Sequence, residues 1–150
     1  MWSSVCLALL VCGLGLVAGD TPANCTYDET RGWWTFTEGP RVGDRNVDCD
    51  NWTPGRGATK TRLFLEFPNL ATDERGNRGT WTLIYNQGFE VVMNFRRYFA
   101  FSNYSRSESF CSSTKAGWAH DILGHNWACF EGRRDGSVQQ GKPLQAEPLR

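Results

Sequence analysis

Few side chains in this 150-residue chain could carry catalytic or metal chemistry. The two histidines, His120 and His125, are five residues apart, and a zinc site would need a third ligand at a suitable spacing. Asp121 is directly adjacent to His120 and does not supply one. The acidic run at Asp48 lacks the glycine and the closing glutamate of a calcium loop. We therefore expect no metal and assign both histidines a structural or surface role.

Nucleophilic catalysis is not supported either. A thiol nucleophile needs an activated cysteine beside a histidine that Asn or Asp holds in place. Cys129 lies between Trp127 and Phe130, and these apolar neighbours favour a buried disulfide over a thiolate. The sequence also lacks a P-loop, a dinucleotide-binding fingerprint and a G-x-S-x-G motif. We expect no catalytic residue and no catalysis by this chain alone.

The first residues resemble a secretory signal. Val5 to Ala18 form an apolar run that suits a signal-peptide core but is too short to span a membrane. Val17 and Gly19 supply the small side chains that a signal peptidase requires. We expect cleavage after Gly19, which makes residues 1–19 a signal peptide and leaves a soluble chain. The alternatives are a buried strand or an uncleaved anchor.

The charge pattern restricts the partners. All sixteen acidic and all sixteen basic side chains lie after residue 19, so the mature chain is close to neutral. This balance argues against nucleic acid as a partner and against a polybasic membrane contact.

Four cysteines remain after signal cleavage: Cys25, Cys49, Cys111 and Cys129. An even number in an oxidising compartment predicts two disulfides, for which three connectivities are possible. Each bond would stabilise the domain by roughly 3–5 kcal/mol in the chain-entropy model.

Three glycosylation sequons agree with this compartment. They begin at Asn24, Asn51 and Asn103, and we expect glycans on these residues and a surface position for each of them.

Short strands separated by turn residues occupy most of the mature chain. The predicted strands are rich in aromatic and β-branched residues and cover 33–37, 62–67, 80–85, 89–95, 98–104 and 127–130. The segment 62–67 places Leu63, Leu65 and Phe67 on one face. Asn86-Gln87-Gly88 is a strong hairpin signal. No stretch shows sustained helical periodicity with caps.

These elements predict an all-β fold that closes to hide its sheet edges. A barrel is the more natural result for one small domain, and a two-sheet sandwich is the alternative. From Arg133 onward the sequence becomes polar and contains Gly and Pro, which indicates a flexible tail.

The expected new N-terminus carries the one unusual functional group. Asp20 would combine a free amine with a short carboxylate at the end of an extended arm, residues 20–24. Pro22 restricts this arm, and a disulfide at Cys25 would anchor it. Such a carboxylate could capture a cationic group, although an ordinary solvated chain end is the simpler interpretation.

Three separate blocks of sequence carry a family resemblance. Residues 20–27 (DTPANCTY), 84–91 (IYNQGFEV) and 117–130 (GWAHDILGHNWACF) resemble, in this order, the N-terminal exclusion domain of dipeptidyl peptidase I, also called cathepsin C. The resemblance covers residues 20–134 with all four cysteines in register. The remaining segment, 135–150, does not look like the family.

The resemblance implies an up-and-down antiparallel β-barrel with disulfides Cys25–Cys111 and Cys49–Cys129. It further implies that the domain blocks one end of the cleft of a papain-like catalytic domain. The carboxylate of Asp20 would bind the protonated N-terminal amine of the peptide substrate. The family forms a lysosomal tetramer that depends on chloride.

The family's catalytic Cys, His and Asn and its chloride site belong to a catalytic domain that this sequence does not contain. We therefore expect no cofactor in this chain and a papain-like partner supplied separately. The alternative is a free secreted β-barrel that binds a small ligand or inhibits a protease. A third possibility is an orphan fragment that misfolds and is degraded.

Overall fold

A computed structural model describes residues 21–43, 45, 47–136 and 142–143. It contains one helix, α1 (Tyr27–Thr30), within these residues. The strands are β1 (Gly32–Glu38), β2 (Thr59–Glu66), β3 (Leu70–Asp73), β4 (Arg78–Ile84), β5 (Gly88–Met93), β6 (Arg96–Tyr104), β7 (Glu108–Thr114), β8 (Gly117–Asp121), β9 (Ala128–Arg134) and β10 (Lys142–Pro143). In the part of the chain that the structure describes, no helix is long and apolar enough to cross a membrane.

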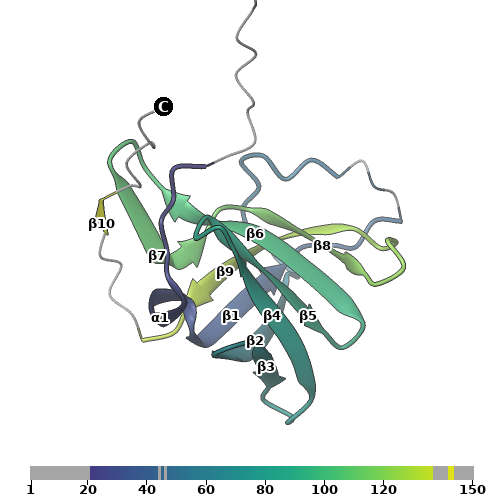
Figure 1. The fold of residues 1–150 in the computed structure, drawn as a ribbon. Helices are drawn as coiled ribbons and strands as arrows, with labels where there is room; N and C mark the ends of the chain where they lie inside the picture. The colour runs from purple at the N-terminus through teal and green to yellow at the C-terminus, as the bar shows by residue number, and fades with distance from the viewer. Residues whose placement is uncertain (1–20, 44, 46, 137–141, 144–150) are drawn as a thin grey trace, which may run out of the picture.

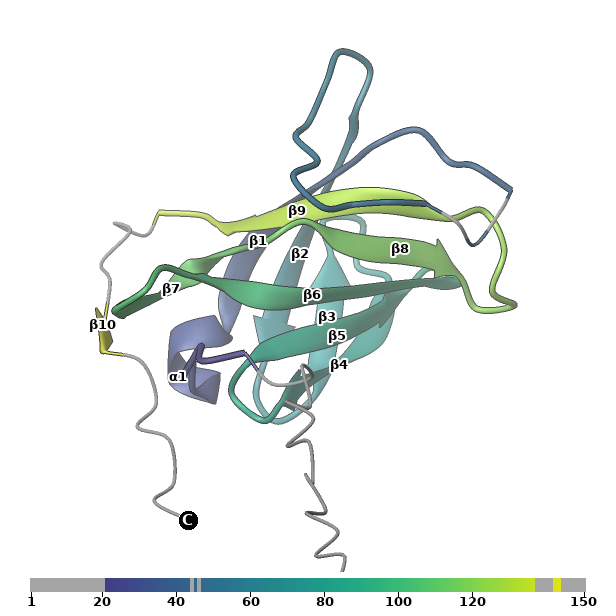
Figure 2. The same cartoon turned by 90° about the horizontal axis from the view of Figure 1, so that it is seen from above.

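The strands close into an eight-stranded antiparallel barrel (Figures 1 and 2). Strands β1 to β6 pair in sequence order, β8 and β9 follow, and β9 returns to pair with β1. Strand β6 pairs with β8 through its first half and with β7 through its second half, so β7 and β8 occupy successive parts of one position. The predicted all-β, up-and-down barrel is confirmed.

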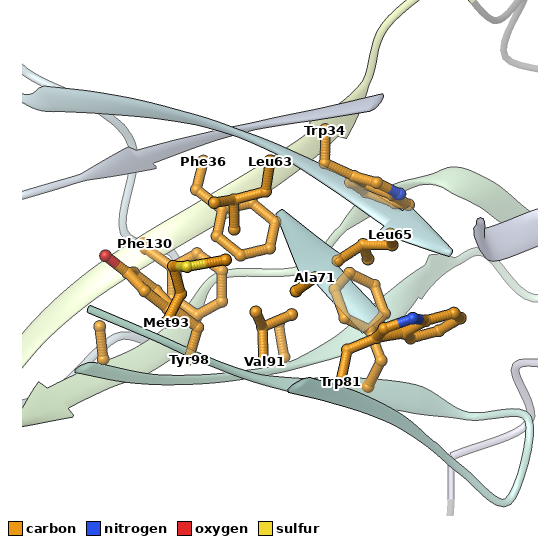
Figure 3. Packing of buried hydrophobic residues seen from close by; sticks show 13 residues of the cluster. Trp34, Phe36, Leu63, Leu65, Ala71, Trp81, Val91, Met93, Tyr98 and Phe130 are labelled. Carbon is orange, nitrogen blue, oxygen red and sulfur yellow. The ribbon is translucent and has the colours of Figure 1, made fainter. Parts of the chain in front are cut away.

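Alternating side chains of the strands fill the barrel interior (Figure 3). Trp34 and Phe36 on β1 are fully buried, and their rings contact the ring of Phe89 on β5. Burial of each such ring stabilises the fold by about 1.5–3 kcal/mol. The buried cluster consists of Trp34, Phe36, Leu63, Leu65, Ala71, Trp81, Phe89, Val91, Met93, Tyr98, Ala100, Ala119 and Phe130.

Several elements differ from the sequence prediction. Strands β3, β7 and β8 were not predicted, and neither was α1, where the backbone N–H of Thr26 donates to the Glu29 carboxylate at 2.9 Å. Phe67, expected on the same strand face as Leu63 and Leu65, lies beyond the end of β2 and is 58% exposed, whereas the other two are buried. Arg133 and Arg134 belong to β9, where Arg134 pairs with Trp34, and are not part of a tail.

An aspartate joins two turns at one end of the barrel. The carboxylate of Asp73 accepts hydrogen bonds from the Asn94 side chain at 2.9 Å, from both nitrogens of Asn77 at 2.8 Å, and from the backbone of Arg75. These hydrogen bonds lower the pKa of Asp73 to about 2, and the bond from Asn94 has the largest effect. The aspartate therefore fixes the β3–β4 turn against the β5–β6 turn.

The lowered pKa of Asp73 predicts an acid-dependent stability. The carboxylate stabilises the fold above its ordinary pKa of 3.8, and this contribution is lost as the pH falls towards about 2. We expect Asp73→Asn to be less stable than the wild type at pH 6 and to show a flatter loss of stability between about pH 4 and pH 2. Urea denaturation across this range measures both effects. Equal slopes for the two proteins would contradict the assignment, and the exposed Asp50→Asn variant serves as the control.

Candidate functional site

The N-terminal arm lies against one end of the barrel. The backbone N–H of Thr21 donates to Oε1 of Gln87 at 3.0 Å, and that of Cys25 donates to the carbonyl of Asn86 at 2.7 Å. The N–H of Asn24 donates to Oγ of Ser109 on β7 at 2.9 Å. The arm is thus held between the β4–β5 turn and β7.

Burial and a disulfide reinforce this attachment. Ala23 and Cys25 have no exposed surface. Cys25 is bonded to Cys111 on β7, with the two Cα atoms 5.5 Å apart, and Cys49 is bonded to Cys129 on β9. The disulfide pairing that the family resemblance implies is therefore confirmed. The first of these bonds fixes the arm covalently to the barrel wall.

Asp20, the predicted amine-binding residue, lies outside the described residues. Its neighbour Thr21 is half-buried and is held by Gln87. The sequence indicates Gln87 only as part of a turn, and its contact with the arm was not predicted. The signal was present in the sequence, because this turn and the arm are two of the three blocks that carry the family resemblance.

Exposed apolar side chains lie at the same end of the barrel as the arm. Tyr85, in the β4–β5 turn, is 85% exposed and has a positive φ of 48°. Phe67, in the β2–β3 turn, packs edge-on against Tyr27 at a ring distance of 5.4 Å. Strands β2 and β4 run in the same direction, so their two C-terminal turns share one end of the barrel. Aromatic side chains are enriched at protein–protein interfaces, so these exposed rings are candidate contacts for a partner protein.

The two histidines occupy the opposite end, around the β8–β9 loop. The ring of His120 stacks on Trp127 at 4.3 Å. The carboxylate of Asp121 accepts hydrogen bonds from the backbone of His125 and Leu123 and from the Asn126 side chain, and these bonds lower its pKa. Among the described residues, no three His, Cys, Asp or Glu side chains lie close enough to hold a metal.

The three sequons differ in their surroundings. Asn51 is exposed and lies in a turn with φ 58°. Asn24 is half-buried within the anchored arm. Asn103 is half-buried on β6, where its side chain contacts Ser113 and the backbone of Tyr104. The expected surface position therefore fits Asn51 best.

Comparison with known proteins identifies the family. Residues 20–134 match the family model described as the cathepsin C exclusion domain. The chain is also 37% identical over 123 residues to cathepsin C of Schistosoma mansoni, which covers 81% of this chain and 26% of that protein. The chain thus spans about a quarter of the length of this curated relative. It belongs to the family of cathepsin C exclusion domains.

Proposed function

We propose that residues 20–134 act as the exclusion domain of a dipeptidyl peptidase, closing one end of the cleft of a papain-like catalytic domain. In this role the carboxylate of Asp20 holds the protonated N-terminal amine of the peptide substrate. The observation that carries the proposal is the anchored arm. Thr21, Asn24 and Cys25 are each bonded to the barrel at the position where the mature chain would begin.

The proposed anchor has a simple physical basis. A carboxylate and an ammonium in contact attract by about 4 kcal/mol at an effective dielectric constant near 20, before the cost of desolvation. Because the arm is fixed, such a pair would also fix where the substrate chain begins. Cleavage would then fall two residues from the substrate N-terminus, which is the behaviour of a dipeptidyl peptidase.

The catalytic domain would contact the end of the barrel that carries the arm. Tyr85 and Phe67 offer apolar rings there. The catalytic residues would come from this partner, in a secretory or lysosomal compartment reached after removal of residues 1–19. Assembly into a tetramer stays a prediction from the family resemblance.

The filled interior supports this docking role over a barrel that carries a ligand inside. Thirteen buried side chains occupy the space between the strands. The cavities near Trp33 and Trp118 lie on the outside of the barrel, because both side chains point away from the interior.

Asp20→Asn tests the proposal in a complex of this chain with a cathepsin C catalytic domain. We expect kcat/KM for dipeptide release to fall about 10- to 100-fold, since a hydrogen bond between two charged groups is replaced by a weaker one. Hydrolysis of a fluorogenic dipeptide substrate measures the change. Asp50→Asn, which alters an exposed carboxylate in the loop between β1 and β2 and creates no new glycosylation sequon, should leave the rate unchanged. An unchanged rate for Asp20→Asn would refute the anchor role.

A further inference from the structure

The outer wall of the barrel carries an aromatic groove, here called the wall groove. It has a volume of about 280 Å³. Strand register explains its composition, because Phe99 pairs with Trp118 and Arg97 pairs with His120 across β6 and β8, while Tyr98 and Ala119 between them point inward. The groove is lined by Glu90, Arg97, Phe99, Trp118, His120 and Trp127, all of them half-buried.

The wall groove has an aromatic part and a polar edge. The rings of His120 and Trp127 are stacked face to face at 4.3 Å with 26° between their planes, so each ring covers one face of the other, and Phe99 and Trp118 supply the rest of the aromatic lining. On the β5 side, Nη1 of Arg97 donates to both carboxylate oxygens of Glu90 at 3.0 Å. The side chains of Arg97 and Glu90 remain 42% and 26% exposed.

These features match the chemistry of a sugar ring. A pyranose has an apolar face of C–H groups that can stack on aromatic rings, and hydroxyl groups that both donate to a carboxylate and accept from a guanidinium. An aliphatic side chain would cover the aromatic surface equally well. It would also remove water from the Glu90–Arg97 pair without replacing the lost hydrogen bonds, which is unfavourable.

The loop between β1 and β2, residues 39–58, brings a glycosylation sequon close to this groove. It is attached to the groove region at two points. The N–H of Val42 donates to the carbonyl of Trp127 at 2.7 Å, and Cys49 is bonded to Cys129, the cross-strand partner of Trp118. Figure 2 shows the loop over β8 and β9.

Asn51 follows Cys49 by two residues and is exposed. Three steps lead from Asn51 to Trp118: along the chain to Cys49, across the disulfide to Cys129 with 5.4 Å between the Cα atoms, and across the strand pair to Trp118. Together they place the Cα of Asn51 within about 18 Å of that of Trp118. A branched glycan of several sugar rings spans such a distance. We propose that a glycan on Asn51 of this chain occupies the wall groove, with a sugar ring stacked on the aromatic side chains and bonded to the Glu90–Arg97 pair. This inference needs the Asn51 sequon to be used and does not depend on a catalytic partner.

The test uses the full chain secreted from mammalian cells. Peptide mass spectrometry measures occupancy of Asn51, and hydroxyl-radical footprinting measures the oxidation rate of Trp118 before and after enzymatic release of N-glycans. We expect oxidation of Trp118 to rise severalfold on release. Trp33, a half-buried outward-facing residue on β1, is the internal control and should not change.

Variants separate groove binding from general shielding. Asn51→Gln should reproduce the high oxidation rate of Trp118, whereas Asn24→Gln should retain the low one. Glu90→Gln should raise the rate with the glycan still attached. Its matched control, Glu131→Gln, alters a carboxylate of similar exposure that pairs with Arg133, and it should have no effect.

Either of two results would overturn the inference. One is the absence of a glycan on Asn51. The other is an oxidation rate of Trp118 that stays the same after release of a glycan that was present on Asn51. Neither result bears on the dipeptidyl-peptidase test, because that test replaces Asp20 and leaves the wall groove and the Asn51 sequon unchanged.

Discussion

Replacing Cys25 and Cys111 together by alanine is expected to lower the free energy of unfolding by about 4–5 kcal/mol, because the bond closes a long loop, with a sequence separation of 86 between the two cysteines. It should also release the N-terminal arm. Without the bond, the short segment from Thr21 to Cys25 would depend on its hydrogen bonds and on the burial of Ala23. Urea denaturation followed by tryptophan fluorescence measures the loss of stability.

The second disulfide provides the control. Cys49 and Cys129 are 80 residues apart, so their replacement by alanine should cost a similar free energy while the arm stays attached. Hydrogen exchange at the amide of Cys25 (or of alanine in its place), which bonds to Asn86, distinguishes the two variants. Equal protection of this amide in both would show that the first bond does not hold the arm. If a double variant is not secreted, selective reduction of the mature protein allows the same comparison.

Glu38→Ala is expected to cost about 3–5 kcal/mol, because it leaves the charge of Arg96 buried without a partner. The side chains of Glu38 and Arg96 are only 4% and 5% exposed, and they connect β1 with β6 inside the barrel. Oε1 of Glu38 accepts from Arg96 and from Arg41, and Oε2 accepts from the hydroxyl of Tyr98. Burial, together with the nearby charge of Glu38, raises the pKa of Tyr98 to about 12.

A second variant separates the loss of a partner from the value of the ion pair. The double replacement Glu38→Leu with Arg96→Met removes both charges and should recover most of the stability, because apolar side chains of similar size replace a buried pair at little cost. Urea denaturation of the single and double variants gives the comparison. A Glu38→Ala variant within about 1 kcal/mol of the wild type would contradict the expectation.

The sequence predicted strands where burial alternates clearly. In β6, Tyr98, Ala100 and Ser102 face inward and Phe99 faces outward, as the period of two indicates. Strand β7 escaped prediction because Ser109, Ser112 and Ser113 are buried although they are polar. Its position depends on pairing with β6 and on the disulfide, and neither is a local property of the segment.

The candidate sites likewise contain features that the sequence predicts and features that depend on contacts between distant segments. The disulfide pairing followed from the family resemblance, whereas the cysteine count alone left three alternatives. The Glu38–Arg96 pair could not be predicted, since the two residues are 58 positions apart and charged side chains are normally expected in water. The wall groove was also missed, because Trp118 and His120 approach Glu90 only once β6 has paired with both β5 and β8, which are far apart in sequence.

Closure of the barrel by β1 and β9 has a consequence for biosynthesis. Strand β1 cannot pair with β9 until residues 128–134 have been synthesised. Until then, the nascent chain has an unpaired sheet edge at β1. In a chain translocated as proposed, Cys25 and Cys49 would enter the oxidising compartment well before Cys111 and Cys129. During that interval they are available to each other, and an early bond between them would have to be exchanged before the native pairs form. Maturation of this domain is therefore expected to depend on a disulfide isomerase more strongly than its small size would indicate.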